Sequence, residues 1–181
     1  MKQSPPDPGT QAPDAEVLYT ILAAQIKAAI AEMDAPPGNL ALVGIHSGGA
    51  WLAERLAADL QLSDRLGFVD VSFYRDDYAA KGLHAEVKPT QIPFSVDGAV
   101  IVLVDDVLYT GRTTRAAINE LFDYGRPARI LLAALVDRGG RELPIAADFV
   151  AATVPLPTGQ ALLLQCAADG QLTLKLTTRH A

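Results

Sequence analysis

The stretch from Val100 to Phe122 constrains the fold more than any other part of the chain. It opens with a run of β-branched and aliphatic residues, 100–104, and two carboxylates follow at once, Asp105 and Asp106. Because core strands exclude acidic side chains, we expect the strand to stop before Asp105. A Thr-Gly turn at 110–114 leads into an amphipathic helix. The apolar face of that helix holds Ala117, Ile118, Leu121 and Phe122.

The same alternation of apolar strand, polar loop and helix occurs along much of the chain. Further short apolar runs lie at 40–45, 68–74 and 130–136. Strands that alternate with helices predict an α/β domain with a mainly parallel sheet flanked by helices. Ligands of such sheets bind at the carboxyl ends of the strands, so the loops after these strands should converge on one site. The first polar residues after the four strands are His46, Arg75, Asp105 and Asp137.

An N-terminal helix is predicted from Asp14, a suitable N-cap, to Met33, before the Pro-Pro-Gly stop at 36–38. Its expected apolar positions are Val17, Leu18, Ile21, Leu22, Ile26, Ala29, Ile30 and Met33. Residues 78–97 show no periodicity, which is typical of a lid or a two-stranded flap. Three shorter strands are expected near the C-terminus, at 147–152, 161–165 and 172–176.

Length and composition indicate one domain at 14–181 and a proline-rich mobile tail at 1–13. No apolar run is long enough for a membrane span, and the tail lacks the pattern of a signal peptide. The single cysteine, Cys166, excludes an internal disulfide and fits a reducing, cytoplasmic location. A formal charge of −6 is unusual for a general nucleic-acid binder, so RNA binding would need a local basic patch.

The turn at 110–114 combines threonine hydroxyls, backbone amides and a helix N-terminus, which together suit a phosphate dianion. It matches neither a Walker loop nor a GxGxxG turn. Asp105 and Asp106 would repel that phosphate unless they face hydroxyl groups or a metal ion. A phosphate beside a diol describes a ribose 5-phosphate. The alternative is a plain strand-to-helix connection with a solvated acidic turn.

Five segments, in order along the chain, carry a closer resemblance. They are LVGI at 42–45, FYRDD at 73–77, VDDVLYTGRTTRA at 104–116, YGRPARI at 124–130 and LVDRGGRELPI at 135–145. Together they are similar to the pyrimidine operon attenuation protein/uracil phosphoribosyltransferase family. The resemblance implies a type I phosphoribosyltransferase-like fold, with a mainly parallel sheet, a flexible loop and a small C-terminal hood.

The resemblance also implies roles for particular residues. The catalytic group would be Asp105, Asp106 and Arg75, with Arg75 opening the flexible loop. The acid pair would hold the ribose hydroxyls of phosphoribosyl pyrophosphate (PRPP), and the following loop would bind the rest of its ribose 5-phosphate through Tyr109, Thr110, Gly111, Arg112, Thr113 and Thr114. The pyrophosphate loop would be His46, Ser47, Gly48 and Gly49. Uracil would contact Val136, Asp137 and Arg138.

The implied reaction converts uracil and PRPP into UMP and pyrophosphate. Mg²⁺ would be held mainly by the substrate rather than by a protein metal site. The resemblance further implies a homo-oligomer and a part in regulating pyrimidine genes.

Two departures from the family pattern keep a second function open. Relatives usually carry threonine-arginine-glycine where this chain has Ser47, Gly48 and Gly49, and a histidine where it has Gly140. The chain is therefore either a uracil phosphoribosyltransferase or a sensor of PRPP or nucleotides. Such a sensor would act as an RNA-binding attenuator with weak or no transferase activity.

Overall fold

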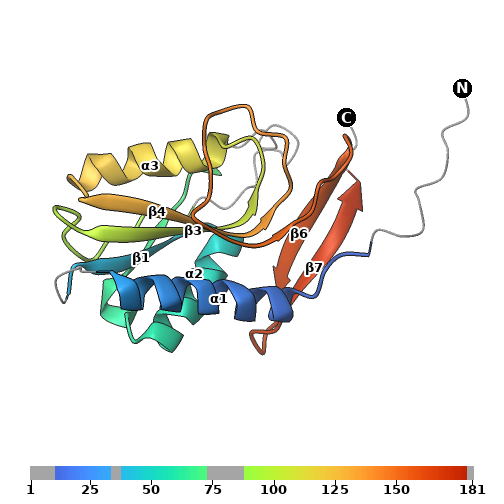
Figure 1. Ribbon diagram of the computed structural model, residues 1–181. Helices are drawn as coiled ribbons and strands as arrows, with labels where there is room; N and C mark the ends of the chain where they lie inside the picture. Colours follow the sequence, from blue (N-terminus) through green and yellow to red (C-terminus); the bar gives the residue numbers. More distant parts are fainter. Residues whose placement is uncertain (1–10, 34–37, 73–87, 179–181) are drawn as a thin grey trace, which may run out of the picture.

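A computed structural model describes residues 11–33, 38–72 and 88–178. Its centre is a five-stranded sheet in the order β2-β1-β3-β4-β5, in which all neighbouring strands are parallel (Figure 1). The strands are β1 (Leu40–Ile45), β2 (Leu66–Val69), β3 (Val100–Leu108), β4 (Arg129–Asp137) and β5 (Phe149–Thr153). The predicted α/β architecture is confirmed.

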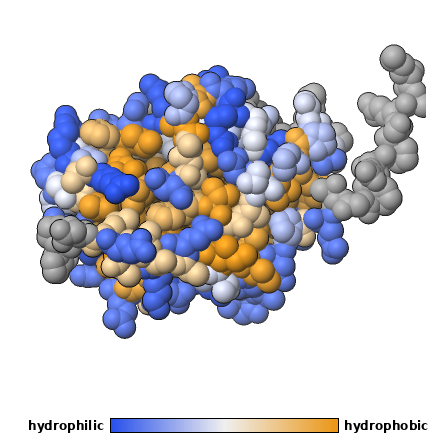
Figure 2. All heavy atoms as spheres, viewed as in Figure 1, coloured by the Kyte–Doolittle hydropathy of each residue, from blue (hydrophilic) through white to orange (hydrophobic). Residues whose placement is uncertain are grey.

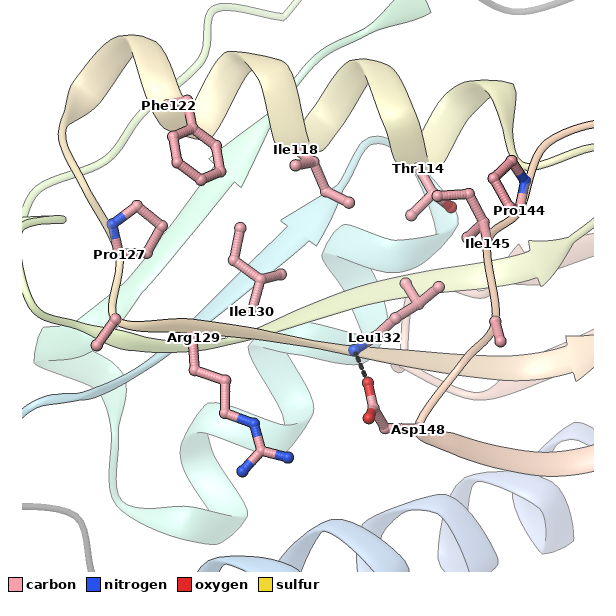
Figure 3. A pocket seen from close by; sticks show the side chains of 12 residues that line it. Thr114, Ile118, Phe122, Pro127, Arg129, Ile130, Leu132, Pro144, Ile145 and Asp148 are labelled. Atoms are coloured by element: carbon pink, nitrogen blue, oxygen red, sulfur yellow. Dashed lines mark hydrogen bonds between the residues drawn. The ribbon is translucent and has the colours of Figure 1, made fainter.

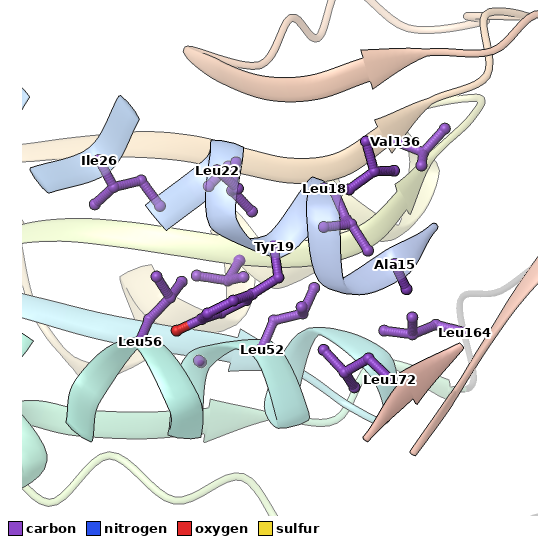
Figure 4. Close-up of a cluster of buried hydrophobic side chains, with 14 of the residues drawn as sticks. Ala15, Leu18, Tyr19, Leu22, Ile26, Leu52, Leu56, Val136, Leu164 and Leu172 are labelled. Carbon is purple, nitrogen blue, oxygen red and sulfur yellow. The ribbon is translucent and has the colours of Figure 1, made fainter. Parts of the chain in front are cut away.

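Helices cover both faces of this sheet. The helices α1 (Ala15–Glu32) and α2 (Gly48–Leu60) lie on one face, and α3 (Arg112–Tyr124) lies on the other (Figure 1). A short 3₁₀ helix, Ser63–Arg65, precedes β2. The core accordingly has two parts, and the larger one joins side chains of α1 and α2, such as Leu22 and Leu56, to the sheet (Figure 4). The smaller one packs Leu121 of α3 on the opposite face.

A two-stranded antiparallel hairpin follows the main sheet, formed by β6 (Gln160–Cys166) and β7 (Leu172–Thr178). Leucines of both strands join the larger core cluster beside Ala15 and Leu18 of α1 (Figure 4). The hairpin lies at the end toward which β3 and β4 run (Figure 1). It is the small C-terminal element that the resemblance implied.

The predicted N-cap of α1 is present, since Asp14 Oδ1 accepts bonds from the amides of Glu16 (2.9 Å) and Val17 (3.2 Å). We expect Asp14→Ala to lower the free energy of unfolding by about 1 kcal/mol, because two amides of the first turn lose their acceptor. Urea denaturation measures this loss. Asp14→Asn keeps a capping oxygen and should stay close to the parent, and equal loss in both variants would contradict a capping role.

Three apolar side chains that we expected in the core are exposed instead of buried. Val17 and Ile21 of α1 are 55% and 39% exposed, and Phe122 of α3 is 43% exposed. The buried stripe of α1 is narrower than its apolar pattern and consists of Ala15, Leu18, Tyr19, Leu22 and Ile26. An apolar period therefore overstates burial where a helix touches the sheet along only one side.

Two strand boundaries also differ from the prediction. The strand expected at 68–74 is β2, Leu66–Val69, because its partner β1 ends at Ile45, which pairs with Val69. The chain then turns at Asp70, whose carboxylate accepts the Ser72 amide at 2.9 Å. The second difference concerns β3, which does not stop before Asp105 but continues to Leu108. Its pairing with β4 persists to that residue and keeps the backbone extended through both acids.

No helix within the described ranges is both long and apolar enough to cross a bilayer.

Candidate functional site

The carboxyl ends of β1, β3 and β4 lie next to one another, since β3 sits between the other two strands in parallel register. This arrangement brings together three of the predicted segments, the loop 46–49, the stretch 105–114 and the turn 136–138. Arg75 belongs to the part of the chain outside the described residues. The site therefore forms between loops that are far apart in sequence, as the strand pattern predicted.

Asp105 and Asp106 form an acid pair near the carboxyl end of β3, and the environments of the two side chains differ. Asp105 is only 5% exposed, and its Oδ1 accepts the Asp106 amide at 3.0 Å. Asp106 is half-buried and lies on the side of α2, against Gly48. Asp105 is thus fixed within the protein, whereas Asp106 borders the loop that precedes α2.

The loop 46–49 makes its closest approach to β3 through two glycines that open α2. A Cβ on Gly48 would overlap the carboxylate of Asp106, and a Cβ on Gly49 would overlap the carbonyl oxygen of Val104. The Ser47 side chain makes no capping bond to α2. The helix therefore begins with backbone amides and no side-chain cap, an arrangement that suits an anion.

His46 is half-buried at the start of this loop, with its ring centroid 5.4 Å from that of Phe68. Its main-chain amide donates to the Val69 carbonyl at 3.0 Å. Burial lowers the pKa of His46, and the positive charge of Lys88 lowers it further, which outweighs the opposite effects of Asp70 and Glu54. The lowered pKa favours the neutral imidazole at this position.

The lowered pKa of His46 predicts a pH dependence of stability. The unfolded chain protonates this histidine near pH 6.5, whereas the folded chain does so only at lower pH, so stability is lost as the pH falls through that window. We expect the wild-type protein to lose stability relative to His46→Gln between pH 7 and pH 5. Urea unfolding across this range tests the difference. Parallel curves for the two proteins would contradict it.

The loop between β3 and α3 is shaped by Gly111, whose φ of +90° is unfavourable for residues with a side chain. Thr110 is buried, and its Oγ1 accepts the Arg112 amide at 3.2 Å. Thr113 is half-buried at the start of the helix. The N-cap residue of α3 is Gly111, which has no side chain to cap the helix. This loop presents a second helix N-terminus to the site.

Thr114 occupies a different place from the rest of that loop. Its side chain is only 1% exposed, and its Oγ1 has no hydrogen-bond partner among the described residues. It lies beside Ile145, at one end of a groove between α3 and β4 of about 390 Å³ (Figure 3). Figure 2 shows apolar surface in the same region. Thr114 is thus buried at the edge of this groove, whereas the residues before it in the loop are the ones that border the carboxyl end of β3.

The turn after β4 closes over the loop after β3. Val136 is fully buried, and Asp137 Oδ1 accepts the Gly139 amide at 2.9 Å. The Arg138 guanidinium stacks on the ring of Tyr109, with its carbon 3.9 Å from the centroid. Asp137 and Arg138 therefore lie beside the loop between β3 and α3.

Two residues that the sequence reasoning did not place in the site hold these two loops together. Arg141 donates to the Tyr109 carbonyl at 2.5 Å, and Arg112 donates from Nη2 and Nε to the same carboxylate oxygen of Glu142, Oε2, at 2.7 and 2.8 Å. The partners are about thirty residues apart in sequence. In the sequence, Arg141 and Glu142 stood out only as charged residues of the segment LVDRGGRELPI. Charged residues are equally typical of a solvated surface.

The residues of the site fit a divalent cation whose ligands come partly from the protein and partly from a bound substrate. The described part of the chain contains no cluster of three or more His, Cys, Asp or Glu side chains placed for a metal. Asp106 offers carboxylate oxygens, the donor type that Mg²⁺ prefers, at the edge of the site. Such an ion would complete its shell with oxygens of the bound molecule.

Comparison with known proteins agrees with this geometry. The phosphoribosyl transferase domain family matches residues 15–156. The bifunctional protein PyrR of Ralstonia nicotianae is 54% identical over 157 residues, which cover 87% of this chain and 88% of that protein. The chain belongs to the PyrR family. PyrR of Nitrosococcus oceani is 53% identical over 137 residues, covering 75% and 76%, and PyrR of Pseudomonas fluorescens is 43% identical over 163 residues, covering 90% and 96%.

Solved structures show the same fold at low identity. The hypoxanthine phosphoribosyltransferase of Trypanosoma cruzi has a TM-score of 0.58 at 22% identity, covering 78% of this chain and 79% of that one. The enzyme of Leishmania tarentolae described as HGPRT-ase in complex with GMP has a TM-score of 0.59 at 18% identity, covering 82% of both chains. The type I phosphoribosyltransferase fold is therefore confirmed, and this PyrR-family chain is a phosphoribosyltransferase-domain protein.

Proposed function

We propose that this protein is a uracil phosphoribosyltransferase, converting uracil and PRPP into UMP and pyrophosphate. The observation that carries the proposal is the acid pair of β3, which borders the N-terminus of α2 at Gly48 and is followed six residues later by the N-terminus of α3 at Arg112. The α2 end would receive the pyrophosphate and the α3 end the 5-phosphate. Asp105 and Asp106 would then face the ribose hydroxyls between them.

In this reaction the bond between C1′ and the pyrophosphate oxygen breaks, the bond between C1′ and uracil N1 forms, and the N1 proton is released. Positive charge develops on the ribose as the leaving group departs. The carboxylates of Asp105 and Asp106 stabilise that charge, and the helix N-termini hold the anionic ends in place. Bound Mg²⁺ would neutralise charge on the pyrophosphate oxygens. The turn 136–138 would hold the uracil over the ribose.

Steady-state assays test the proposal directly. The purified protein with PRPP and Mg²⁺ is offered uracil, and hypoxanthine, guanine and orotate serve as competing bases. We expect UMP formation that far exceeds transfer to the other three bases. Transfer to a purine in preference to uracil would overturn the base assignment, and no transfer to any base would overturn the enzymatic function.

The relatives are named bifunctional protein PyrR, which favours a second function beside transfer. The candidate that the family resemblance implies is regulation of pyrimidine genes through RNA. The formal charge of −6 restricts such binding to a local basic surface. An RNA titration at several salt concentrations tests it. Specific binding, with an affinity that changes on addition of UMP or PRPP, would support the sensor. RNA binding without turnover would favour the regulatory function over the enzymatic one.

In either role we expect the protein to be a homo-oligomer in the cytoplasm.

A further inference from the structure

The guanidinium of Arg141 contacts three different stretches of the chain at once. Its Nη1 donates to the Tyr109 carbonyl at 2.5 Å, its Nε donates to the Ile145 carbonyl at 2.9 Å, and its Nη2 pairs with Asp137 Oδ2 at 2.5 Å. All three nitrogens are engaged. The planar group is consequently fixed in both position and orientation.

These contacts join the two halves of the proposed binding site. Tyr109 opens the loop on the phosphate side, and Asp137 opens the turn on the base side. The backbone repeats the link, since the amides of Glu142 and Leu143 both donate to the Thr110 carbonyl, at 2.9 and 3.1 Å. Arg141 directly precedes the two residues whose amides donate these bonds.

We propose that Arg141 is a positioning residue that fixes the separation between the base-binding turn and the phosphate-binding loop. This inference rests on the proposed function. Its guanidinium contacts main-chain carbonyls and Asp137, so it acts on the substrate through other groups. A misplacement of about 1 Å between reacting groups is sufficient to cost about 10²-fold in rate.

A lysine at this position cannot replace the arginine. Its ammonium is a single point on a flexible stem, whereas the planar fork of Arg141 reaches two carbonyls and a carboxylate in fixed directions. Partial burial of Arg141 and Asp137, whose side chains are 24% and 20% exposed, makes the loss of either partner more costly than at the surface. Arg141→Lys and Arg141→Gln should therefore behave alike.

Ligand binding distinguishes positioning from a general loss of structure. UMP spans both loops, whereas ribose 5-phosphate reaches only the phosphate side. In calorimetric titrations we expect Arg141→Gln and Arg141→Lys to weaken UMP at least 10-fold and ribose 5-phosphate less than 3-fold. We also expect kcat to fall more than the KM for PRPP rises. Equal weakening of both ligands, or UMP affinity within 2-fold of the parent, would overturn the proposal.

A measurement without ligand keeps this inference separable from the proposed function. Hydrogen exchange at the amides of Glu142 and Leu143 should accelerate at least 10-fold in Arg141→Gln, because their bonds to Thr110 depend on the same connection. Arg126→Gln is the matched control, since Arg126 also donates to carbonyls, those of Phe122 and Gly125, at the far end of α3. Unchanged exchange in Arg141→Gln would refute the positioning role, even if the enzyme proves inactive with uracil.

Discussion

Replacement of both Asp105 and Asp106 by asparagine is expected to lower kcat/KM for UMP formation by about 10³-fold or more, with the fold retained. Removal of a single preorganised electrostatic group from an active site commonly costs about 10² to 10³-fold in rate. The amides preserve the shape of the carboxylates but remove both negative charges and replace one acceptor oxygen of each group by a donor NH2. The lost rate therefore reports the loss of charge and of hydrogen-bond acceptors rather than a change in packing.

The single variants separate the two acids. Asp105 is buried and accepts the Asp106 amide, and this bond persists in Asp105→Asn through the remaining oxygen. Each single variant should lie between the parent and the double variant in kcat/KM. Asp123→Asn on the exposed surface of α3 is the control and should leave both rate and melting temperature unchanged. Full activity with uracil in the double variant would rule out a role for the acids in transfer.

Alanine at Gly49 is expected to damage both stability and activity, whereas alanine at Gly48 should chiefly damage activity. The new methyl group at Gly49 would overlap the Val104 carbonyl, which belongs to the fixed backbone of β3. Such overpacking costs about 1 to 3 kcal/mol and exceeds the gain of at most about 1 kcal/mol from the higher helix propensity of alanine. The methyl group at Gly48 would displace the side chain of Asp106 instead.

Thermal unfolding and kcat/KM, measured on the same samples, test this contrast. Ser47→Ala is the control for stability, because the Ser47 side chain makes no capping bond to α2. We expect its melting temperature to match that of the parent and that of Gly49→Ala to fall by several degrees. If Gly48→Ala retained full activity, the contact between this loop and Asp106 would have no part in the reaction.

The general architecture was predictable because it follows from local patterns. Apolar runs that end in polar loops predicted the parallel sheet, and Asp14 predicted the start of α1. The limits of β3 were not predictable in this way, since pairing with β4 carries the strand through Asp105 to Leu108. Burial of a carboxylate there depends on neighbouring strands, which the local sequence does not contain.

The candidate site was predictable as a set of loops but not as a set of contacts. The approach of Gly48 to Asp106 joins residues more than fifty positions apart. Arg141 was an ordinary charged residue in sequence, and its importance arises only when Tyr109 and Ile145 come within reach. Thr114 shows the converse, because its place in a threonine-rich loop gave no sign that the first turn of α3 buries its side chain.

Under the proposed function, the charges that a bound molecule would meet run from positive at the N-terminus of α2, through negative at the acid pair, to positive at the N-terminus of α3. PRPP in its ground state is anionic at both ends and neutral at the ribose, so it matches only the outer two members of that order. A molecule whose central ring carries positive charge matches all three. In the proposed reaction the site would therefore be more complementary to the charge distribution of the transition state than to that of PRPP, because the attraction of the acid pair would rise only as the leaving group departs.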